Sequence, residues 1–544
     1  MFARINTAGL LGIEGYLVSI EADVRNGIPC FNLTGMLSAE TKEAQSRVWN
    51  AIKNSNVRVE PRRVTVNFSP ASVRKEGTAY DLPVAAAVLC GYGVLDHEEL
   101  KHTAFLGETG LDGSLKPVRG MLPLSFAVRK SGCTRLVVPL ENVREAQLVE
   151  GLDVIGCRSI SEVIEVLKHP DSIKCKPHGT VRREEGICEK EKCKTSQFHS
   201  TFCETESLES ISCKTANYEK YDFKNVHGQR FLKRAAEIAA SGMHNILMTG
   251  PAGTGKTMIA KCIPSILPEL TREEDIEISK VYSICGMLPA DRPLLSKRPF
   301  RSPHHTVTAA AFAGGGIRAM PGELSLASGG VLFLDELNKF SDSVIANLFL
   351  PLEEHRTVIN RLNGSCTYPA DFLLSAAMNN CPCGFYPDRN RCTCTPPQIR
   401  NHLGRVSKPL LERIDICAEA APLSYEDIAG KRDRSPEEPS EVIRRRVEEV
   451  HRIQAERFKN SSIRFNSRMS VEDIEKYCIL GSEETDYIRN VFSERYLSGR
   501  TYHKILKTAR TIADMDRSER ISVRHLAEAA GLRSLEDKLS SGLR

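Results

Sequence analysis

Two hydrophobic patterns alternate over the first 168 residues, one with the two-residue period of strands and one with the helical period. Strand-like runs occupy residues 15–24, 62–70 and 134–140. Helical patterns occupy residues 40–55, 81–93 and 143–151. Chains that mix such segments form α/β domains. Residues 1–168 are therefore predicted to be one α/β domain.

Both patterns are lost over residues 169–219, which are polar, charged and aperiodic. This composition predicts a linker. The cysteines of this segment are irregularly spaced, so we interpret them as incidental thiols rather than metal ligands. They are Cys175, Cys188, Cys193, Cys203 and Cys213.

Apolar runs return in residues 220–430, with helical segments between them. The runs are HNILMTG at 244–250, GGVLFLD at 329–335 and FLLSAAMN at 372–379. Short apolar strands separated by helices predict a parallel sheet. Residues 440–544 carry helical patterns at 441–458, 502–515 and 523–531, which predict a small all-helical domain.

Composition agrees with a large globular chain. At about 100–200 residues per domain, 544 residues predict three or four domains. The charged fraction of 26% excludes wholesale disorder, and the net charge of +5 permits a nucleic-acid partner without requiring one. The sequence shows neither a signal peptide nor an apolar run of about 20 residues, so we expect a cytoplasmic protein whose 18 cysteines stay reduced.

A glycine-rich segment after the first apolar run matches the motif G-x-x-x-x-G-K-[ST] at every fixed position. It lies between a predicted strand and a predicted helix, which is the context that a phosphate-binding loop requires. Its backbone N–H groups would surround the phosphates, its lysine would neutralise the β and γ oxygens, and its threonine would bind Mg²⁺. The residues are Gly250, Pro251, Ala252, Gly253, Thr254, Gly255, Lys256 and Thr257.

Polar side chains follow the other two apolar strands. Asp335 and Glu336 end the run GGVLFLD, and they suit a metal ligand and a group that activates water. A pair of acids that caps the next helix is the alternative. Asn379 and Asn380 end the third run, where an amide can orient the water or contact the γ-phosphate, unless it only begins a turn.

Four cysteines form the pattern C-x-C-x₈-C-x-C within residues 381–394. Such thiols in a reduced protein favour a structural, tetrahedral Zn²⁺ site, with free thiols as the alternative. A catalytic zinc is not expected, because four cysteines leave no open position. The ligands would be Cys381, Cys383, Cys392 and Cys394.

Four ordered blocks of this sequence resemble the AAA+ ATPases, and within them the magnesium-chelatase-like branch with its YifB/ComM-type family. The blocks span residues 226–257, 301–337, 376–416 and 496–516. The chain has LDELNKF and MNNCPCG where that family usually has LDELPEF and MNPCPCG. The resemblance implies a central P-loop AAA+ domain over 220–430 and a C-terminal helical lid over 440–544.

The resemblance also implies roles for residues outside the phosphate loop. His227 and Gln229 match positions that line the adenine pocket, and Asn379 matches the sensor-1 position. Arg413 matches the arginine finger that reaches a neighbouring subunit, and Arg500 matches the lid arginine called sensor 2. A shared active site implies a ring, expected to be a homo-hexamer. An ion pair of Arg413 with Glu412 or Asp415 is the alternative.

A segment between the two nucleotide motifs, residues 297–322, is basic and contains three consecutive glycines. In the chelatase-like branch such inserts project toward the pore of the ring, and a basic mobile loop there suits a phosphate backbone. A solvated basic loop is the alternative. The basic residues are Lys297, Arg298, Arg301, His304, His305 and Arg318, and the glycines are Gly314, Gly315 and Gly316.

Residues 1–168 resemble the ribosomal-S5-like domain that forms the peptidase part of Lon-type proteases, through residues 75–85 and 105–122. That activity requires a serine and a lysine base. Here the two positions fall at Ala79 and Leu122, so the domain is predicted to be non-proteolytic. Ser72, Lys75 and Lys116 lie nearby in sequence. The domain is expected to act as a scaffold or to contact DNA through Arg62, Arg63, Arg74 and Lys75.

The resemblance implies an Mg²⁺-dependent ATP hydrolase that moves on single-stranded or branched DNA, as a helicase or branch-migration motor in recombination and natural transformation. Three alternatives remain at this point. They are a chelatase-like motor with a protein or metal-insertion client, a regulator that binds ATP without hydrolysis, and an ATP-dependent protease. Ala79 and Leu122 oppose the protease.

Overall fold

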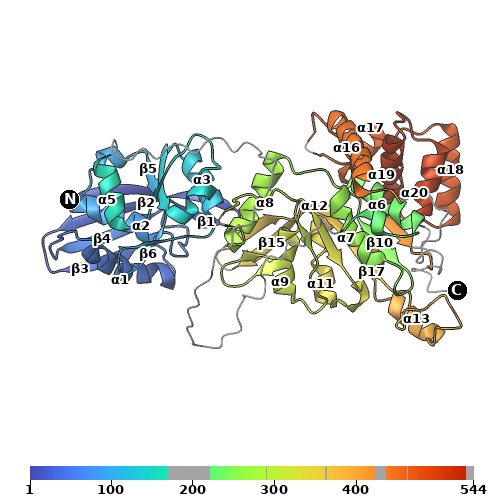
Figure 1. Ribbon diagram of the computed structural model, residues 1–544, viewed down its shortest axis with the longest axis horizontal. Helices are drawn as coiled ribbons and strands as arrows, with labels where there is room; N and C mark the ends of the chain where they lie inside the picture. Colours follow the sequence, from blue (N-terminus) through green and yellow to red (C-terminus); the bar gives the residue numbers. More distant parts are fainter. Residues whose placement is uncertain (170–220, 290, 362–363, 423–436, 462, 534–544) are drawn as a thin grey trace, which may run out of the picture. The chain divides into compact units, whose positions relative to one another are not determined.

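The computed structural model describes residues 1–169, 221–289, 291–361, 364–422, 437–461 and 463–533. Two compact units divide the chain (Figure 1). The first contains residues 1–9, 17–118 and the chain from 127 onward up to 215, and the second contains residues 10–16, 119–126 and 216–544. The predicted linker at 169–219 and its five cysteines lie outside the described residues, apart from residue 169.

A seven-stranded sheet in the order β3-β4-β2-β1-β5-β8-β9 forms the centre of the first unit. Parallel pairs join β1 to β5, β5 to β8 and β8 to β9, and β2 pairs antiparallel with β4. The strands are β1 (Phe2–Leu11), β2 (Glu14–Arg25), β3 (Cys30–Thr34), β4 (Arg63–Ser69), β5 (Thr103–Phe105), β8 (Arg135–Pro139) and β9 (Asp153–Cys157). A separate short pair joins β6 (Glu108–Thr109) and β7 (Leu115–Lys116).

The helices near this sheet include two that match the patterns at 40–55 and 81–93, and two, at 121–130 and 160–168, that the sequence pattern did not predict. The helices are α1 (Ala39–Asn54), α2 (Asp81–Gly91), α3 (Met121–Lys130), α4 (Val143–Ala146) and α5 (Ile160–Lys168), with 3₁₀ turns η1 (Glu98–Leu100) and η2 (Leu140–Asn142). Helix α1 begins where Ser38 accepts a hydrogen bond from the Thr41 N–H. The helix predicted over 143–151 is wrong in length, because α4 ends after about one turn at Ala146.

A five-stranded parallel sheet in the order β11-β14-β17-β10-β18 forms the core of the second unit. Its strands are β10 (Ile246–Thr249), β11 (Phe300–Arg301), β14 (Val331–Leu334), β17 (Leu373–Met378) and β18 (Ile416–Glu419). The predicted parallel sheet is therefore confirmed. The order places β17 between β10 and β14, so the carboxyl ends of these three strands, where the candidate residues follow, lie side by side.

Helices and small hairpins surround that sheet. The helices are α6 (Arg230–Gly242), α7 (Lys256–Ile266), α8 (Arg272–Cys285), α9 (Ala309–Ala313), α10 (Glu323–Leu326), α11 (Asp342–Ala346), α12 (Phe349–Glu354), α13 (Pro396–Leu403) and α14 (Lys408–Leu411), with 3₁₀ turns η6 (Phe223–Asn225) and η7 (Leu337–Lys339). The hairpins pair β12 (Gly314–Gly315) with β13 (Met320–Pro321), and β15 (Arg356–Arg361) with β16 (Gly364–Pro369). The β12–β13 pair shows that two of the three glycines form a strand.

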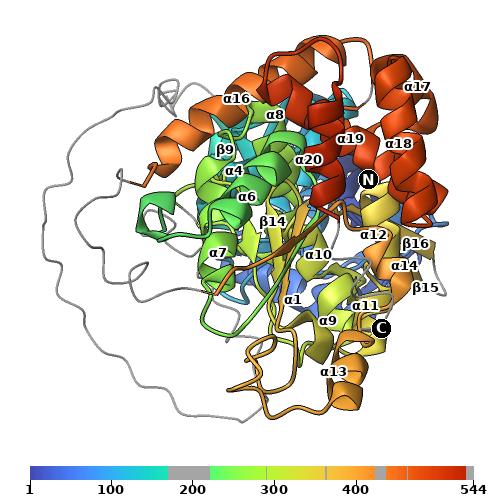
Figure 2. The same ribbon diagram turned by 90° about the vertical axis from the view of Figure 1, so that its right-hand side faces the viewer.

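The C-terminal segment is helical, and Figure 2 shows its helices gathered beside α6. They are α16 (Ser440–Arg457), α17 (Val471–Tyr477), α18 (Ser482–Glu494), α19 (Gly499–Met515) and α20 (Val523–Gly531), with the 3₁₀ turn η8 (Asn466–Arg468). Their apolar faces share one core with α6, α7 and the inner strands. Among the described residues, no helix is long and apolar enough to cross a membrane.

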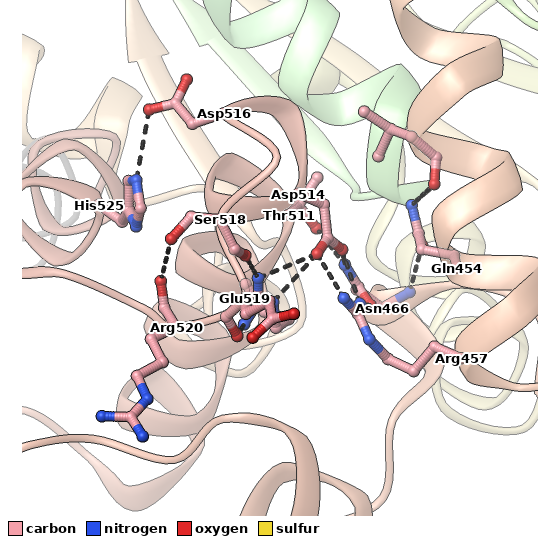
Figure 3. A network of polar contacts seen from close by, with 12 residues as sticks. Gln454, Arg457, Asn466, Thr511, Asp514, Asp516, Ser518, Glu519, Arg520 and His525 are labelled. Carbon is pink, nitrogen blue, oxygen red and sulfur yellow. Dashed lines mark hydrogen bonds and ion pairs between the residues drawn. The ribbon is translucent and has the colours of Figure 1, made fainter.

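A buried carboxylate organises this helical segment, as Figure 3 shows. Asp514 on α19 is 2% exposed and pairs with Arg457 of α16, at 2.6 Å from Nη1 to Oδ2. Asp514 also accepts hydrogen bonds from Arg510 Nε at 3.1 Å and from Asn466 Nδ2 at 2.8 Å. The network therefore joins α16, η8 and α19 at one point.

We expect Asp514→Ala to lower the opening free energy of the backbone amides in α16 and α19 by about 3–5 kcal/mol, because it leaves the buried Arg510 and the largely buried Arg457 without their counter-charge. Native-state hydrogen exchange measures this quantity residue by residue. The matched control is Asp486→Ala, which removes an exposed pair with Arg489 and should change exchange little. Equal protection in both variants would contradict the role assigned to Asp514.

Candidate functional site

The phosphate-binding motif forms a loop between β10 and the start of α7. Gly250, Gly253 and Gly255 have φ values of +142°, +78° and +86°. All three angles lie in the positive-φ region, which glycine adopts without a steric penalty. The loop leads directly into the first turn of α7, and glycine-rich loops at a helix N-terminus are suited to binding phosphate.

Lys256 is directed back along this loop. Its Nζ donates to the carbonyl oxygens of Gly250 and Pro251, at 2.9 and 2.7 Å, and to Asn379 Oδ1 at 3.2 Å. Burial lowers the pKa of Lys256 to about 8, against the opposing effect of Asp335. The ammonium group thus lies between the phosphate loop and the end of β17, where it can pair with an anionic ligand.

We expect nucleotide affinity to fall as the pH rises through about 8, because the deprotonated Lys256 no longer neutralises the phosphates. Above that pH the loss approaches about tenfold per pH unit. Fluorescent ADP titrations from pH 7 to 9.5 measure it. Lys256→Arg is the control, since arginine stays charged and its weaker affinity should not depend on pH in this range. A flat profile for the unchanged protein would count against a titrating lysine.

The acids at the end of β14 lie beside the helix that begins with Lys256. Thr257 Oγ1 donates to Asp335 Oδ2 at 3.0 Å, so a hydroxyl and a carboxylate of the type that binds Mg²⁺ are adjacent. Glu336 has a φ of +54°, which is strained for a residue with a side chain. Its carboxylate pairs with Lys339 at 2.8 Å and remains 39% exposed, so solvent and ligands can reach it.

The two asparagines after β17 have different partners. Asn379 contacts Lys256, whereas the buried Asn380 donates from Nδ2 to Glu419 Oε1 at 3.2 Å. The structure therefore brings Asn379, and not Asn380, to the phosphate loop.

His402 on α13 was not identified from the sequence. Its Nε2 donates to the Asn379 carbonyl oxygen at 3.0 Å, and its Nδ1 lies 3.1 Å from Asn338 Nδ2. Burial lowers the pKa of His402, so the ring is neutral at pH 7 and commits its single N–H to Asn379. The histidine thereby links the end of β17 to η7, the turn that follows Glu336. A lone histidine in a helix gives no sequence signal for this contact.

The two residues expected near adenine are placed differently. Gln229 exchanges two hydrogen bonds with the backbone of Ala421, at 2.6 and 3.2 Å, just after β18. The neighbouring Ala420 lies against Gly250, where an added Cβ would meet it at 2.7 Å. Gln229 is therefore fixed near the start of the phosphate loop, and His227 is exposed to solvent.

Arg413 and Arg500 lie together around Glu353. Arg413 pairs with Glu353 at 2.8 Å, and Arg500 approaches the same carboxylate at 3.7 Å. Both line a cavity of about 350 Å³ that contains none of residues 250–257. Within one chain the cavity thus gathers Arg413 and Arg500 without the phosphate loop, and Arg413 pairs with neither Glu412 nor Asp415.

The backbone that carries Arg413 is held by a contact from α19. Lys504 of α19 donates to the Arg413 carbonyl oxygen at 3.0 Å and pairs with Asp415 at 2.6 Å. Asp415 is buried and also accepts from the Asn245 N–H, one residue before β10. The pKa of Asp415 lies below its usual range despite burial, because Lys504 and His244 face it. These contacts join the arginine cluster to the strand that leads into the phosphate loop.

The basic insert is mostly ordered, and two of its arginines are structural. Arg298 pairs with Glu274 at 3.1 Å and is 8% exposed. Arg301 donates two hydrogen bonds, from Nε and Nη2, to the carboxylate of Glu323. The expectation of a mobile basic loop over 297–322 is therefore wrong for these two residues. The rings of His304 and His305 lie 4.1 Å apart between centroids, tilted by 38°. The exposed basic side chains of the insert are Lys297, His304 and Arg318.

The four cysteines of residues 381–394 converge to within 4.8 Å of one another. The Sγ–Sγ distances are 3.3 Å for Cys381 to Cys383, 3.8 Å for Cys381 to Cys392 and 3.6 Å for Cys383 to Cys392. Four thiolates about 2.3 Å from a tetrahedral ion are separated by about 3.8 Å. The residues present therefore fit a thiolate-bound metal.

The peptidase-like positions of residues 1–168 offer little for catalysis. Leu122 is fully buried, and Ala79 carries no reactive group. Lys75 is buried as well, and its Nζ donates to the Pro70 carbonyl oxygen, while Ser72 and Lys116 are exposed. The expectation of DNA contact through Lys75 is therefore wrong. Arg62 and Arg74 pair with Glu60 and Glu76.

Three family models match successive segments of the chain. The model described as magnesium chelatase subunit ChlI matches residues 222–428, a second model of ChlI matches residues 20–142, and the ChlI C-terminal model matches residues 437–533. The matches cover the sheet with the phosphate loop, the first unit and the helical segment in turn. Both sheets and the helical segment thus contain residues that match magnesium-chelatase models.

Full-length relatives give the same result. The competence protein ComM of Haemophilus influenzae is 35% identical over 533 residues, covering 98% of this chain and 97% of ComM. YifB of Salmonella typhimurium is 33% identical with the same coverage. Lon protease 2 of Bacillus subtilis is 24% identical over 196 residues, 33% of this chain. With these relatives and the three family matches, the chain belongs to the YifB/ComM-type family of magnesium-chelatase-like AAA+ proteins.

Proposed function

We propose that this protein is an Mg²⁺-dependent ATP hydrolase whose active site is shared between neighbouring subunits of a ring. The observation that carries this proposal is the separation of two half-sites in one chain. Lys256, Thr257, Asp335 and Asn379 form one half, and Arg413 and Arg500 form the other around Glu353. A second copy, placed head to tail, brings the two halves together, and such contacts close into rings.

In this mechanism each residue of the two half-sites has a separate role. The phosphate loop and Lys256 would bind the β and γ phosphates of ATP, and Thr257 and Asp335 would hold Mg²⁺, which neutralises charge on the phosphates. Glu336 would accept a proton from the attacking water, and Asn379 would orient that water. Arg413 and Arg500 of the neighbouring subunit would stabilise the charge on the transferred phosphoryl group.

We further propose that ATP hydrolysis moves the ring on single-stranded or branched DNA, in the cytoplasm, during recombination. The name of one relative, a competence protein, and the net charge of +5 support this role. Lys297, His304 and Arg318 are the exposed basic residues of the insert that would contact the phosphate backbone. Helicase or branch-migration activity in natural transformation is the corresponding biological function.

A three-stranded DNA substrate tests this role. ATP should drive displacement of its labelled strand by the intact protein, and Glu336→Gln should abolish displacement while the protein still binds the DNA. Displacement that requires no ATP, or none under any condition, would contradict a DNA motor.

The alternative is a chelatase-like motor with a protein or metal-insertion client. The three matches to magnesium-chelatase models favour it. This alternative predicts ATP turnover that does not respond to DNA.

We also propose that residues 1–168 form a ribosomal-S5-like, Lon-like domain without peptidase activity. Residues 440–544 would form the lid. The four cysteines would hold structural Zn²⁺. The Lon protease 2 match and the residues Ala79 and Leu122 support the first assignment. The Sγ distances of 3.3–3.8 Å support zinc. Casein should remain intact during incubation with the protein and ATP.

A further inference from the structure

We propose that the metal held by the four cysteines controls nucleotide binding, because the cysteine turn forms part of the wall of the phosphate loop. The inference rests on the proposed zinc site and on nucleotide binding alone. It requires neither DNA nor a ring. The argument depends on one backbone hydrogen bond and on the position of one glycine.

The hydrogen bond joins the phosphate loop to the cysteine turn. The Ala252 N–H, within the motif, donates to the Gly384 carbonyl oxygen at 2.8 Å. Gly384 directly follows Cys383, and its own N–H donates to the Cys381 carbonyl oxygen at 3.1 Å. The carbonyl that holds Ala252 is therefore oriented by the turn between the first two cysteines.

The fit at this contact is close. Gly384 has a φ of +82°, and a Cβ added there would lie 2.9 Å from the Cβ of Ala252. Only a residue without a side chain allows the cysteine turn to approach the phosphate loop this closely. The glycine is thus explained by packing against the loop as well as by its backbone angle.

The second pair of cysteines connects the same ion to Asn379. Cys394 is followed at once by Thr395, which caps the start of α13, and α13 carries His402. His402 in turn holds the Asn379 carbonyl oxygen. A metal bound by both pairs would fix Ala252 on one side and the Asn379 end of β17 on the other.

Turn hydrogen bonds, such as those donated by the N–H groups of Asp388 and Cys392, hold the 381–394 loop locally, and Tyr386 packs against the core. Cys383, Cys392 and Cys394 are only partly buried, and the loop between the cysteine pairs is largely exposed. Four thiolates on one ion would add a cross-link between the two cysteine pairs. Loss of the ion should therefore loosen both contacts with the nucleotide site.

Two kinds of variant test the proposal on the full chain, by metal content and by the Kd for fluorescent ADP. Intact protein should contain one zinc, and cobalt in its place should show the visible absorption of tetrahedral thiolate coordination. The double variant Cys392→Ser and Cys394→Ser should lose the zinc and bind ADP at least about tenfold more weakly. Cys30→Ser, which removes a cysteine of the first unit, is the control and should change neither quantity.

Gly384→Ala tests the contact between Gly384 and Ala252 without removing a cysteine. It should retain zinc and bind ADP about tenfold more weakly, because its methyl group displaces Ala252. Gly132→Ala is the matched control, since Gly132 has a φ of +87° and an added Cβ meets no atom within 4 Å. Both glycine variants should keep the far-ultraviolet circular dichroism of the intact protein.

Either of two results would overturn the proposal. One is intact protein that is free of zinc, with four titratable thiols or with disulfides in the cluster. The other is a zinc-free double variant that binds ADP as tightly as the intact protein does. A failure of DNA stimulation alone would contradict the proposed motor and leave this inference standing, because ADP binding is measured without DNA.

Discussion

Arg413→Ala is expected to lower kcat for ATP hydrolysis by at least about a thousandfold and to leave the Kd for ADP unchanged. The reason is geometric. Arg413 lies with Arg500 around Glu353, in a cavity that contains no residue of the phosphate loop. In the proposed ring, its guanidinium group would stabilise the transferred phosphoryl group of a neighbouring subunit. Steady-state turnover and fluorescent ADP titration measure the two quantities.

A mixture of two inactive variants gives the test that a local packing defect cannot imitate. Arg413→Ala subunits retain Glu336, and Glu336→Gln subunits retain Arg413. In randomly mixed rings at equal amounts, about a quarter of the shared sites contain both intact groups, so turnover should reappear. No recovery in rings that demonstrably exchange subunits would show that Arg413 does not act between subunits.

Glu336→Gln is expected to lower kcat by about a hundred- to ten-thousandfold, the usual contribution of a general base. The amide keeps the shape of the side chain but cannot accept the proton of the attacking water. Nucleotide binding should persist, because Lys256, Thr257 and Asp335 are unchanged. Rapid-quench measurement of bound ATP should then show uncleaved ATP on the enzyme.

Glu354→Gln is the matched control for that variant, since Glu354 is a partly exposed glutamate that pairs with Arg356. Its turnover should equal that of the intact protein. If Glu336→Gln also kept full turnover, Glu336 would be excluded as the base, and its strained backbone would need another explanation.

Much of the central sheet could be predicted from the sequence because its strands are short, apolar and followed by polar residues. HNILMTG, GGVLFLD and FLLSAAMN became β10, β14 and β17, adjacent in one parallel sheet. The spatial closeness of Lys256, Asp335 and Asn379 follows from that order. Local sequence patterns and sheet topology were sufficient for this half of the candidate site.

The other half depends on contacts between distant segments, which local patterns do not encode. Glu353 gathers Arg413 and Arg500 from segments 87 positions apart (500 − 413), and no motif marks it. The charge of the insert was misleading for a similar reason. Arg298 and Arg301 are basic in the sequence, but Glu274 and Glu323 neutralise them in the fold.

The contact between Gly384 and Ala252 also could not be predicted from the sequence. The cysteine pattern alone predicts a metal, but it does not say what the metal would hold in place. The hydrogen bond from the Ala252 N–H to the Gly384 carbonyl oxygen, at 2.8 Å, shows that the cysteine turn contacts the phosphate loop.

The most direct test of the central claim is the steady-state ATPase rate of the purified full chain, with and without single-stranded DNA, beside Glu336→Gln. The account predicts turnover that DNA strongly stimulates and that the variant loses in both conditions. Turnover that ignores DNA would contradict the DNA motor and favour a protein or metal-insertion client. No turnover with intact ADP binding would contradict the ATP hydrolase itself.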